Sequence, residues 1–275
     1  MAITRKSGKE LAFLHDLFVA TDWGERFAEL VDEHVHLPTK GRMLYLGAGT
    51  GGHALAIHER TGEKTSILLV EENEESLELA KAKSTAINEQ AEFRSGRLDD
   101  LDLPDNQFDV VIGNASLISH RRVSRMISEM VRVAAPNATV AIVLPTASSF
   151  GEFFSIYWEA LHNCGLIDHE SDVENLITGL PTISELEQTI ETAGLEETAS
   201  TCQIEEFDFE SGEAFLNAPL ISDFLMPGWL ESLADEDREN VAAEIAKIIN
   251  EERHEGEFAL TVKATLLVGR KAFAH

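Results

Sequence analysis

The chain has 275 residues, of which 44% are hydrophobic, so it can bury the core of one large α/β domain and is not disordered. Its 49 acidic and 22 basic side chains give a net charge of -27, which excludes a nucleic-acid-binding or anionic-membrane-binding protein. There is no apolar targeting segment or membrane-length run, and the two cysteines, Cys164 and Cys202, form no CxxC pair. We therefore expect a cytoplasmic protein without disulfides, membrane insertion or a metal site.

The acidic charge is concentrated in the second half. Residues 1–150 hold 22 acidic and 16 basic side chains, whereas residues 151–275 hold 27 and 6. No Lys or Arg lies between Arg132 and Arg238. A solvated acidic surface explains this pattern, and so do a docking face for a basic protein partner and adaptation to high salt. The sequence leaves these readings open, together with the possibility of a homodimer.

The first 150 residues predict helices followed by alternating strands and helices. Apolar residues at helical spacing indicate two helices in residues 1–40, separated around Thr21-Asp22-Trp23, and Pro38 and Gly41 then interrupt the chain. Strands alternating with helices imply a parallel sheet with right-handed crossovers. The expected strands are 42–47, 66–70, 92–94, 108–112 and 138–144, and the expected helices between them are 54–60, 74–88 and 123–134.

The remaining residues are mixed. Helices are expected at 150–163, 183–193 and 235–253, and strands at 197–209 and 258–269. We divide the chain into an N-terminal helical lid segment (1–40), a nucleoside-binding core (41–150) and a C-terminal part (151–275). This last part completes the sheet and carries two acidic, α-rich insertions, near 150–180 and 207–253, which we expect to cap the carboxyl edge of the sheet.

A glycine-rich loop, Gly47-Ala-Gly-Thr-Gly-Gly52, joins the first predicted strand to its helix. Such a loop lets a ligand approach the backbone and the N–H groups of the helix N-terminus. The pattern GxGxxG, through Gly47, Gly49 and Gly52, is typical of dinucleotide sites, whereas GxGxG, through Gly47, Gly49 and Gly51, is typical of a different nucleoside cofactor. Both expect an acid at the end of the second strand to bind ribose hydroxyls, and Glu71 follows that strand.

Two further segments resemble the class I methyltransferases that use S-adenosylmethionine (SAM). They are Leu103-Pro-Asp-Asn-Gln-Phe-Asp-Val-Val111, similar to the family's LPFPDNSFDVV, and Val131-Arg-Val-Ala-Ala-Pro-Asn137, similar to its RVLKPGG turn. The second half also resembles the quinone- and biotin-pathway branch of small-molecule methyltransferases. The resemblance implies a Rossmann-like α/β fold with a seven-stranded sheet, mostly parallel, whose last strand is antiparallel. SAM would lie across the carboxyl ends of the central strands.

The resemblance also implies roles for individual residues. Position by position, Gly47, Gly49 and Gly51 would approach the methionine part of SAM, Glu71 would hold the ribose, the backbone of Leu98 would meet adenine, and Asn114 would line the methyl-transfer side.

Two positions depart from the family pattern. Tyr45 stands where an acid normally helps to neutralise the amino group of the cofactor. Arg97 stands where an acid normally receives the adenine amino group, and Asp99 or Asp100 would have to substitute. Losing such contacts costs affinity, so these departures favour weak, rearranged or lost SAM binding.

Candidate catalytic residues follow the fourth and fifth strands. Besides Asn114, His120 is the candidate general base, with an exposed loop histidine as the alternative. Tyr157 is expected to wall the acceptor pocket, with helix packing as an equally good explanation. His53 and His58, on the helix after the glycine loop, are expected on its surface.

These observations favour a SAM-dependent methyltransferase acting on a small, apolar or aromatic molecule or an acyl chain. Apolar residues in the insertions support that acceptor class, unless they form the core of the cap: Phe153, Phe154, Phe215, Phe224, Met226 and Trp229. The alternative is a methyltransferase-like protein that has lost turnover and serves in binding or regulation. A NAD-dependent oxidoreductase is disfavoured, because the Leu103–Asn114 segment and the final strand have no role in it.

Overall fold

The computed structural model describes residues 6–252 and 258–273, which fall into two compact units. The sheet unit comprises Lys6–Leu144, Thr182–Cys202 and Ala264–His275, and the insert unit comprises Pro145–Pro181 and Gln203–Lys263. The sequence placed divisions near residues 40 and 150. The structure instead groups residues 6–40 with the sheet, and the chain returns to the sheet unit twice after first leaving it.

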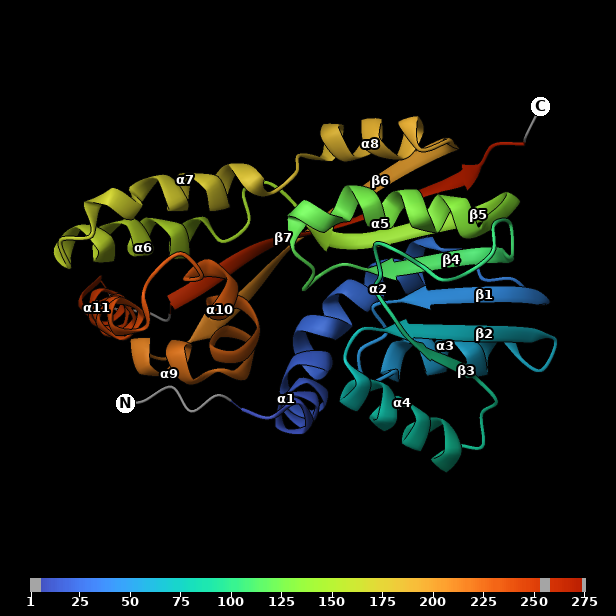
Figure 1. Ribbon diagram of the computed structural model, residues 1–275, viewed down its shortest axis with the longest axis horizontal. Coiled ribbons are helices and arrows are strands. Elements are labelled where there is room, and N and C mark those ends of the chain that lie inside the picture. Colours follow the sequence, from blue (N-terminus) through green and yellow to red (C-terminus); the bar gives the residue numbers. More distant parts are fainter. Residues whose placement is uncertain (1–5, 253–257, 274–275) are drawn as a thin grey trace. The chain divides into compact units, whose positions relative to one another are not determined.

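The sheet has seven strands in the order β3-β2-β1-β4-β5-β7-β6 (Figure 1), mostly parallel with one antiparallel strand, as predicted. In the parallel register Leu44 lies beside Leu68 on one side and Val111 on the other. The strands are β1 (Gly41–Leu46), β2 (Thr65–Glu71), β3 (Glu92–Ser95), β4 (Phe108–Asn114), β5 (Ala134–Pro145), β6 (Leu195–Phe209) and β7 (Phe258–Lys271).

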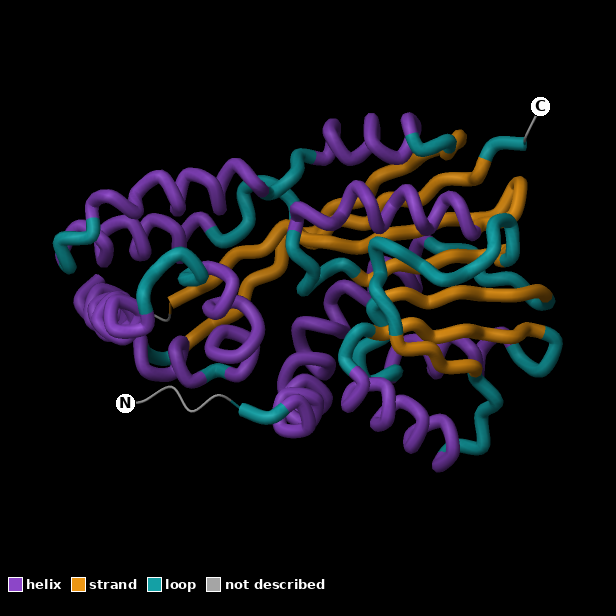
Figure 2. Tube along the Cα trace, viewed as in Figure 1, coloured by secondary structure: helices purple, strands orange, loops and turns teal. Residues whose placement is uncertain are grey.

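Helices connect β1 to β2, β2 to β3 and β4 to β5, whereas a loop connects β3 to β4; Figure 2 draws helices in purple and strands in orange. On one face of the sheet, Leu44 and Leu46 share a buried core with Met126 and Met130 of α5 and with Leu186 of α8. Because side chains alternate along a strand, Tyr45 points to the opposite face. The helices of this unit after the N-terminal segment are α2 (Glu25–His34), α3 (Gly52–Thr61), α4 (Glu74–Ala86), α5 (His120–Val133) and α8 (Ile183–Thr192).

The helix break predicted around Thr21-Asp22-Trp23 is wrong. Helix α1 (Gly8–Leu14) runs into a π-helical segment, His15–Gly24, and this runs into α2 with helical backbone angles at both junctions. Trp23 is buried, and Asp22 accepts a hydrogen bond from Arg26 Nε at 2.9 Å. The polar residues that suggested a break are therefore accommodated on a continuous helix.

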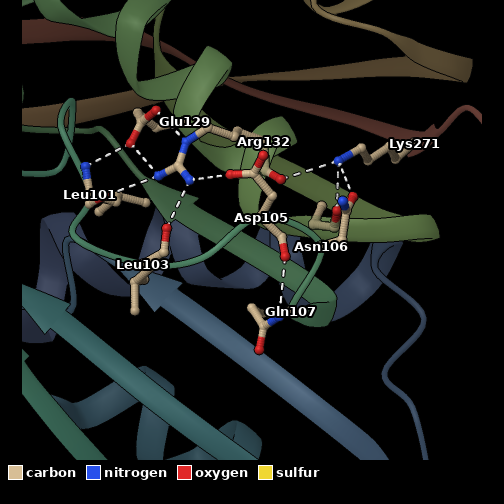
Figure 3. A network of polar contacts seen from close by, with 9 residues as sticks. Leu101, Leu103, Asp105, Asn106, Gln107, Glu129, Arg132 and Lys271 are labelled. Carbon is tan, nitrogen blue, oxygen red and sulfur yellow. Dashed lines mark hydrogen bonds and ion pairs between the residues drawn. The ribbon is translucent and has the colours of Figure 1, made fainter. Parts of the chain in front are cut away.

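Two cations hold the turn that precedes β4 (Figure 3). The Arg132 guanidinium on α5 donates to the carbonyl oxygen of Leu101 at 2.9 Å and to Asp105 at 2.6 Å. The Lys271 ammonium on β7 donates to Asn106 Oδ1 at 2.8 Å, and Asn106 has a φ of 59°, a left-handed conformation that Asn tolerates. The polar residues of the Leu103–Val111 motif thus fix the entry to the fourth strand.

The insert unit is mainly helical, and its aromatic residues form its own core. The ring of Phe153 stacks on Trp229 with centroids 4.1 Å apart, and both side chains are buried together with Phe154, Phe215 and Met226. The sequence predicted α6 and α11 but did not predict α7 or the short helical segments. The helical elements are α6 (Gly151–Asn163), a 3₁₀ turn (Ile167–His169), α7 (Glu170–Gly179), α9 (Gly212–Asn217), a π-helical segment (Leu220–Leu225), α10 (Met226–Trp229) and α11 (Asp235–Glu252).

Within the described part of the chain, none of the helices combines the length and the apolar character that crossing a membrane requires.

Candidate functional site

The glycine loop between β1 and α3 is packed too closely to accept side chains. Gly47 has a φ of +68°, and a Cβ there would lie 2.3 Å from the backbone carbonyl oxygen of Asn114. Gly51 has a φ of +81°, and its Cβ would lie 2.8 Å from that of Ala80 on α4. The loop is tied to the end of β2, because the Gly47 N–H donates to the carbonyl of Val70 at 3.0 Å. Only glycine fits these two positions.

Glu71 lies at the end of β2, and its carboxylate faces the loop. One oxygen accepts the Gly49 N–H at 2.8 Å, and the other accepts the N–H groups of Glu72 and Asn73 at 2.9 and 3.0 Å. Burial raises the pKa of Glu71, while these three hydrogen bonds act in the opposite direction. A carboxylate offers about four acceptor positions, so one remains for a ligand hydroxyl. The arrangement therefore fits the ribose contact predicted for Glu71.

The two groups predicted to meet adenine already have partners within the protein. The Leu98 N–H donates to Glu72 Oε1 at 3.1 Å. The Asp99 carboxylate, 4% exposed, accepts from Arg122 at 2.6 Å and from Arg97 at 3.0 Å. Arg122 is the main reason that the pKa of Asp99 is well below its usual range. Adenine bound beside Leu98 and Asp99 would have to compete with these contacts.

The N-terminal π-helical segment lies against the glycine loop. A Cβ on Gly49 would be 2.8 Å from His15 Cε1, so the imidazole ring packs directly on that glycine. The next residue, Asp16, accepts a hydrogen bond from the hydroxyl of Thr50 at 2.5 Å and pairs with Lys83 of α4. Burial lowers the pKa of His15. No periodic pattern in the sequence indicated these contacts.

Tyr45 is 3% exposed, and its hydroxyl lies 2.8 Å from His53 Nδ1. The other ring nitrogen of His53 lies 3.0 Å from Asp32 Oδ1. The prediction that His53 and His58 lie on the helix surface is wrong. His58 is 6% exposed, and its Nε2 lies 3.0 Å from the carbonyl oxygen of Thr65.

The structure brings most of the predicted cofactor residues together. Gly47 adjoins both Asn114 and the Leu98 side chain, at 2.3 and 3.5 Å from the position of a Cβ. His120 is the first residue of α5 in the same unit and is partly buried. Tyr157 lies in the insert unit, where it is fully buried and stacks on Phe153 at 5.7 Å. Tyr157 therefore packs in the core of the insert unit and is not exposed as the wall of a pocket.

The insert unit contains a pocket of about 570 Å³ along α6. Phe154, Trp158 and Ile177 supply apolar walls, and Glu159 and His162 supply polar groups beside them. Among residues 6–252 and 258–273, no three His, Cys, Asp or Glu side chains converge as a metal site would need.

Comparison with known proteins identifies related sequences. Residues 43–137 match the family described as "Methyltransferase domain". The chain is 30% identical over 124 residues to the glycine/sarcosine/dimethylglycine N-methyltransferase of Actinopolyspora halophila, covering 45% of this chain and 22% of that protein. It is 28% identical over 118 residues to the norajmaline N-methyltransferase of Rauvolfia serpentina, covering 43% and 40%. These matches span less than half the length of either relative.

Solved structures resemble most of the chain. The YcgJ protein of Bacillus subtilis superposes with a TM-score of 0.60 at 15% identity, covering 91% of this chain and all of that one. At so low an identity this likeness establishes the fold alone.

Proposed function

We propose that this chain, which contains a class I SAM-dependent methyltransferase domain, binds SAM and transfers the cofactor's methyl group to a small molecule. The observation that carries the proposal is the pairing of the glycine loop with Glu71. The loop has no room for side chains at Gly47 and Gly51, and the carboxylate beside it retains one acceptor position. The quinone- and biotin-pathway branch stays a prediction.

The residues of the sheet unit would hold the cofactor and align it. SAM supplies an activated methyl group on a sulfonium, and transfer needs the acceptor in line with it in a site that excludes water. The backbone of the loop from Gly47 to Gly51 would approach the methionine part, and Glu71 would accept from the ribose. Asn114 ends β4 beside the loop and lines the transfer side. His120 takes a proton from acceptors that must lose one.

We propose a small, apolar or aromatic acceptor that carries an amine. The apolar walls formed by Phe154, Trp158 and Ile177 support the apolar part. Residues 145–181 and 203–263 carry 22 acidic and 4 basic side chains, a charge that favours neutral or cationic molecules over phosphates. The two named relatives are N-methyltransferases, which supports an amine.

A second candidate function is a binding or regulatory module that has lost turnover. It is favoured by the partners already held by Asp99 and the Leu98 N–H, and by Tyr45 in place of an acid. The acidic insert unit would then be the docking surface for a basic partner.

Incubation with methyl-labelled SAM and a panel of small aromatic amines tests the proposal. We expect label in an amine product, and we expect Trp158→Ala to raise the KM for the amine about tenfold without changing SAM affinity, because an aromatic wall is lost. Ile204→Ala, at an exposed site on β6, is the matched control. SAM binding without transfer to any amine would favour the second candidate, and absence of SAM binding would refute the methyltransferase proposal.

A further inference from the structure

We propose that His53 and Asp32 are positioning residues of the cofactor site, which act through the Tyr45 hydroxyl to supply the polarity that an acid would give at position 45. This inference rests on the proposed function. Its basis is a chain of hydrogen bonds that crosses four elements of the sheet unit: α2, α3, β1 and β4. These hydrogen bonds link Asp32 to His53, His53 to Tyr45, and Tyr45 to Asn114.

The direction of the first two hydrogen bonds follows from the charge of Asp32. Its Oδ1 also accepts from Arg60 at 2.5 Å, and the contacts with His53 and Arg60 lower the pKa of Asp32 to about 2. Asp32 is therefore a carboxylate at neutral pH and can only accept, so His53 Nε2 carries a proton. In the tautomer that carries its single ring proton on Nε2, the imidazole has its lone pair on Nδ1. In that tautomer the Tyr45 hydroxyl, 2.8 Å away, donates to His53.

Asn114 is the second hydrogen-bond partner of the Tyr45 hydroxyl. Its Oδ1 accepts the backbone N–H of Ser116 at 3.0 Å, which turns the amide nitrogen the other way. That amide makes a hydrogen bond to Tyr45 that favours its ionised form, so the amide donates to the phenolic oxygen. Burial outweighs this bond and keeps the pKa of Tyr45 above its usual value. The Tyr45 oxygen is thus a neutral acceptor, held at a fixed position between two side chains.

The sequence position of Tyr45 and the backbone of its partner Asn114 connect this network to the glycine loop. Tyr45 lies two residues before Gly47, and the Asn114 backbone carbonyl lies 2.3 Å from where a Cβ on Gly47 would be. The methionine part of SAM carries an ammonium group, which needs a partner with negative potential. Hydrogen bonds in series polarise one another, so the negative charge of Asp32 increases the acceptor strength of the Tyr45 oxygen without placing a second charge there.

The inference is tested by calorimetric binding of three ligands: SAM, its demethylated product S-adenosylhomocysteine, and 5′-methylthioadenosine, which lacks the amino-acid part. We expect His53→Ala and Asp32→Asn each to weaken binding of SAM and S-adenosylhomocysteine about tenfold while methylthioadenosine binds as before. His53→Asn should restore most of the affinity, because its amide oxygen can accept the Tyr45 proton where Nδ1 stood. His36→Asn, at an exposed histidine, is the control.

Two results would overturn the inference with the proposed function intact. One is SAM affinity unchanged in His53→Ala, and the other is an equal loss for all three ligands, which would indicate a merely structural role. If the unaltered protein binds none of the three ligands, the proposed function fails, and this inference fails with it.

Discussion

Glu71 has three backbone N–H groups on its two oxygens and one acceptor position left. Glu71→Gln replaces one oxygen with an NH₂ group that cannot accept, so at least one backbone donor or the ribose loses its partner. A hydrogen bond to a charged group contributes about 1.5–3 kcal/mol, so we expect SAM affinity to fall about 10- to 100-fold by calorimetry. Glu59→Gln, on the exposed side of α3, should bind as the unaltered protein does. An affinity for SAM within twofold of the unaltered protein in Glu71→Gln would rule out the ribose role.

The glycine positions and Glu71 could be predicted because the signal is local. A strand, a turn and a helix put the loop and the end of the next strand at the same edge of a parallel sheet. The link between Asp32, His53 and Tyr45 left no such signal. It joins α2, α3 and β1 through single polar side chains, and the sequence pattern of α3 suggested only an exposed histidine. Contacts of this kind follow from packing between elements.

At the scale of elements, the N-terminal π-helical segment is held to the glycine loop by Asp16. Its carboxylate joins Thr50 of the loop to Lys83 of α4. Asp16→Asn removes the ion pair, so we expect faster hydrogen exchange in residues 8–24 and faster dissociation of SAM, several-fold in each case. Asp22→Asn is the control, because its partner Arg26 lies one turn further along the same continuous helix, on α2. Unchanged exchange in Asp16→Asn would show that the segment is held by apolar packing alone.

Most elements of the sheet unit were predictable, because β1, β2 and β4 are largely apolar runs and a helix follows each of them. The N-terminal helices were misread at Thr21-Asp22-Trp23, since polar residues on a continuous helix look like a break when the buried Trp23 anchor is not known. The short helices α9 and α10 have six and four residues. Segments of that length are too short to develop a helical period.

At the scale of the whole molecule, the sequence placed divisions near residues 40 and 150, whereas the structure shows a sheet unit that is interrupted twice along the chain. The interruptions are residues 145–181 and 203–263, which form the insert unit, and residues 182–202 and 264–273 belong to the sheet unit. Long-range strand pairing determines this arrangement, and composition does not reveal it. With these unit boundaries, most of the acidic excess falls in the insert unit: residues 145–181 and 203–263 carry 22 acidic and 4 basic side chains.

The chain has two tyrosines, Tyr45 and Tyr157, one in each unit and both buried. Burial raises both pKa values, that of Tyr157 to about 12, whereas an unfolded chain ionises both near 10. Each tyrosine therefore contributes stability that is complete below about pH 10 and is lost as the pH rises through its folded value. We expect tyrosinate absorbance of the native protein to rise only above pH 10, and a smaller alkaline loss of stability in Tyr157→Phe. Ionisation of both tyrosines at pH 10 in the native protein would contradict their burial.

Calorimetric titration of the unaltered protein with SAM, S-adenosylhomocysteine and NAD tests the central claim most directly. We expect both sulfur nucleosides to bind with dissociation constants below about 1 mM and NAD not to bind. Binding of NAD, with neither sulfur nucleoside bound at millimolar concentration, would contradict a methyltransferase site at the glycine loop.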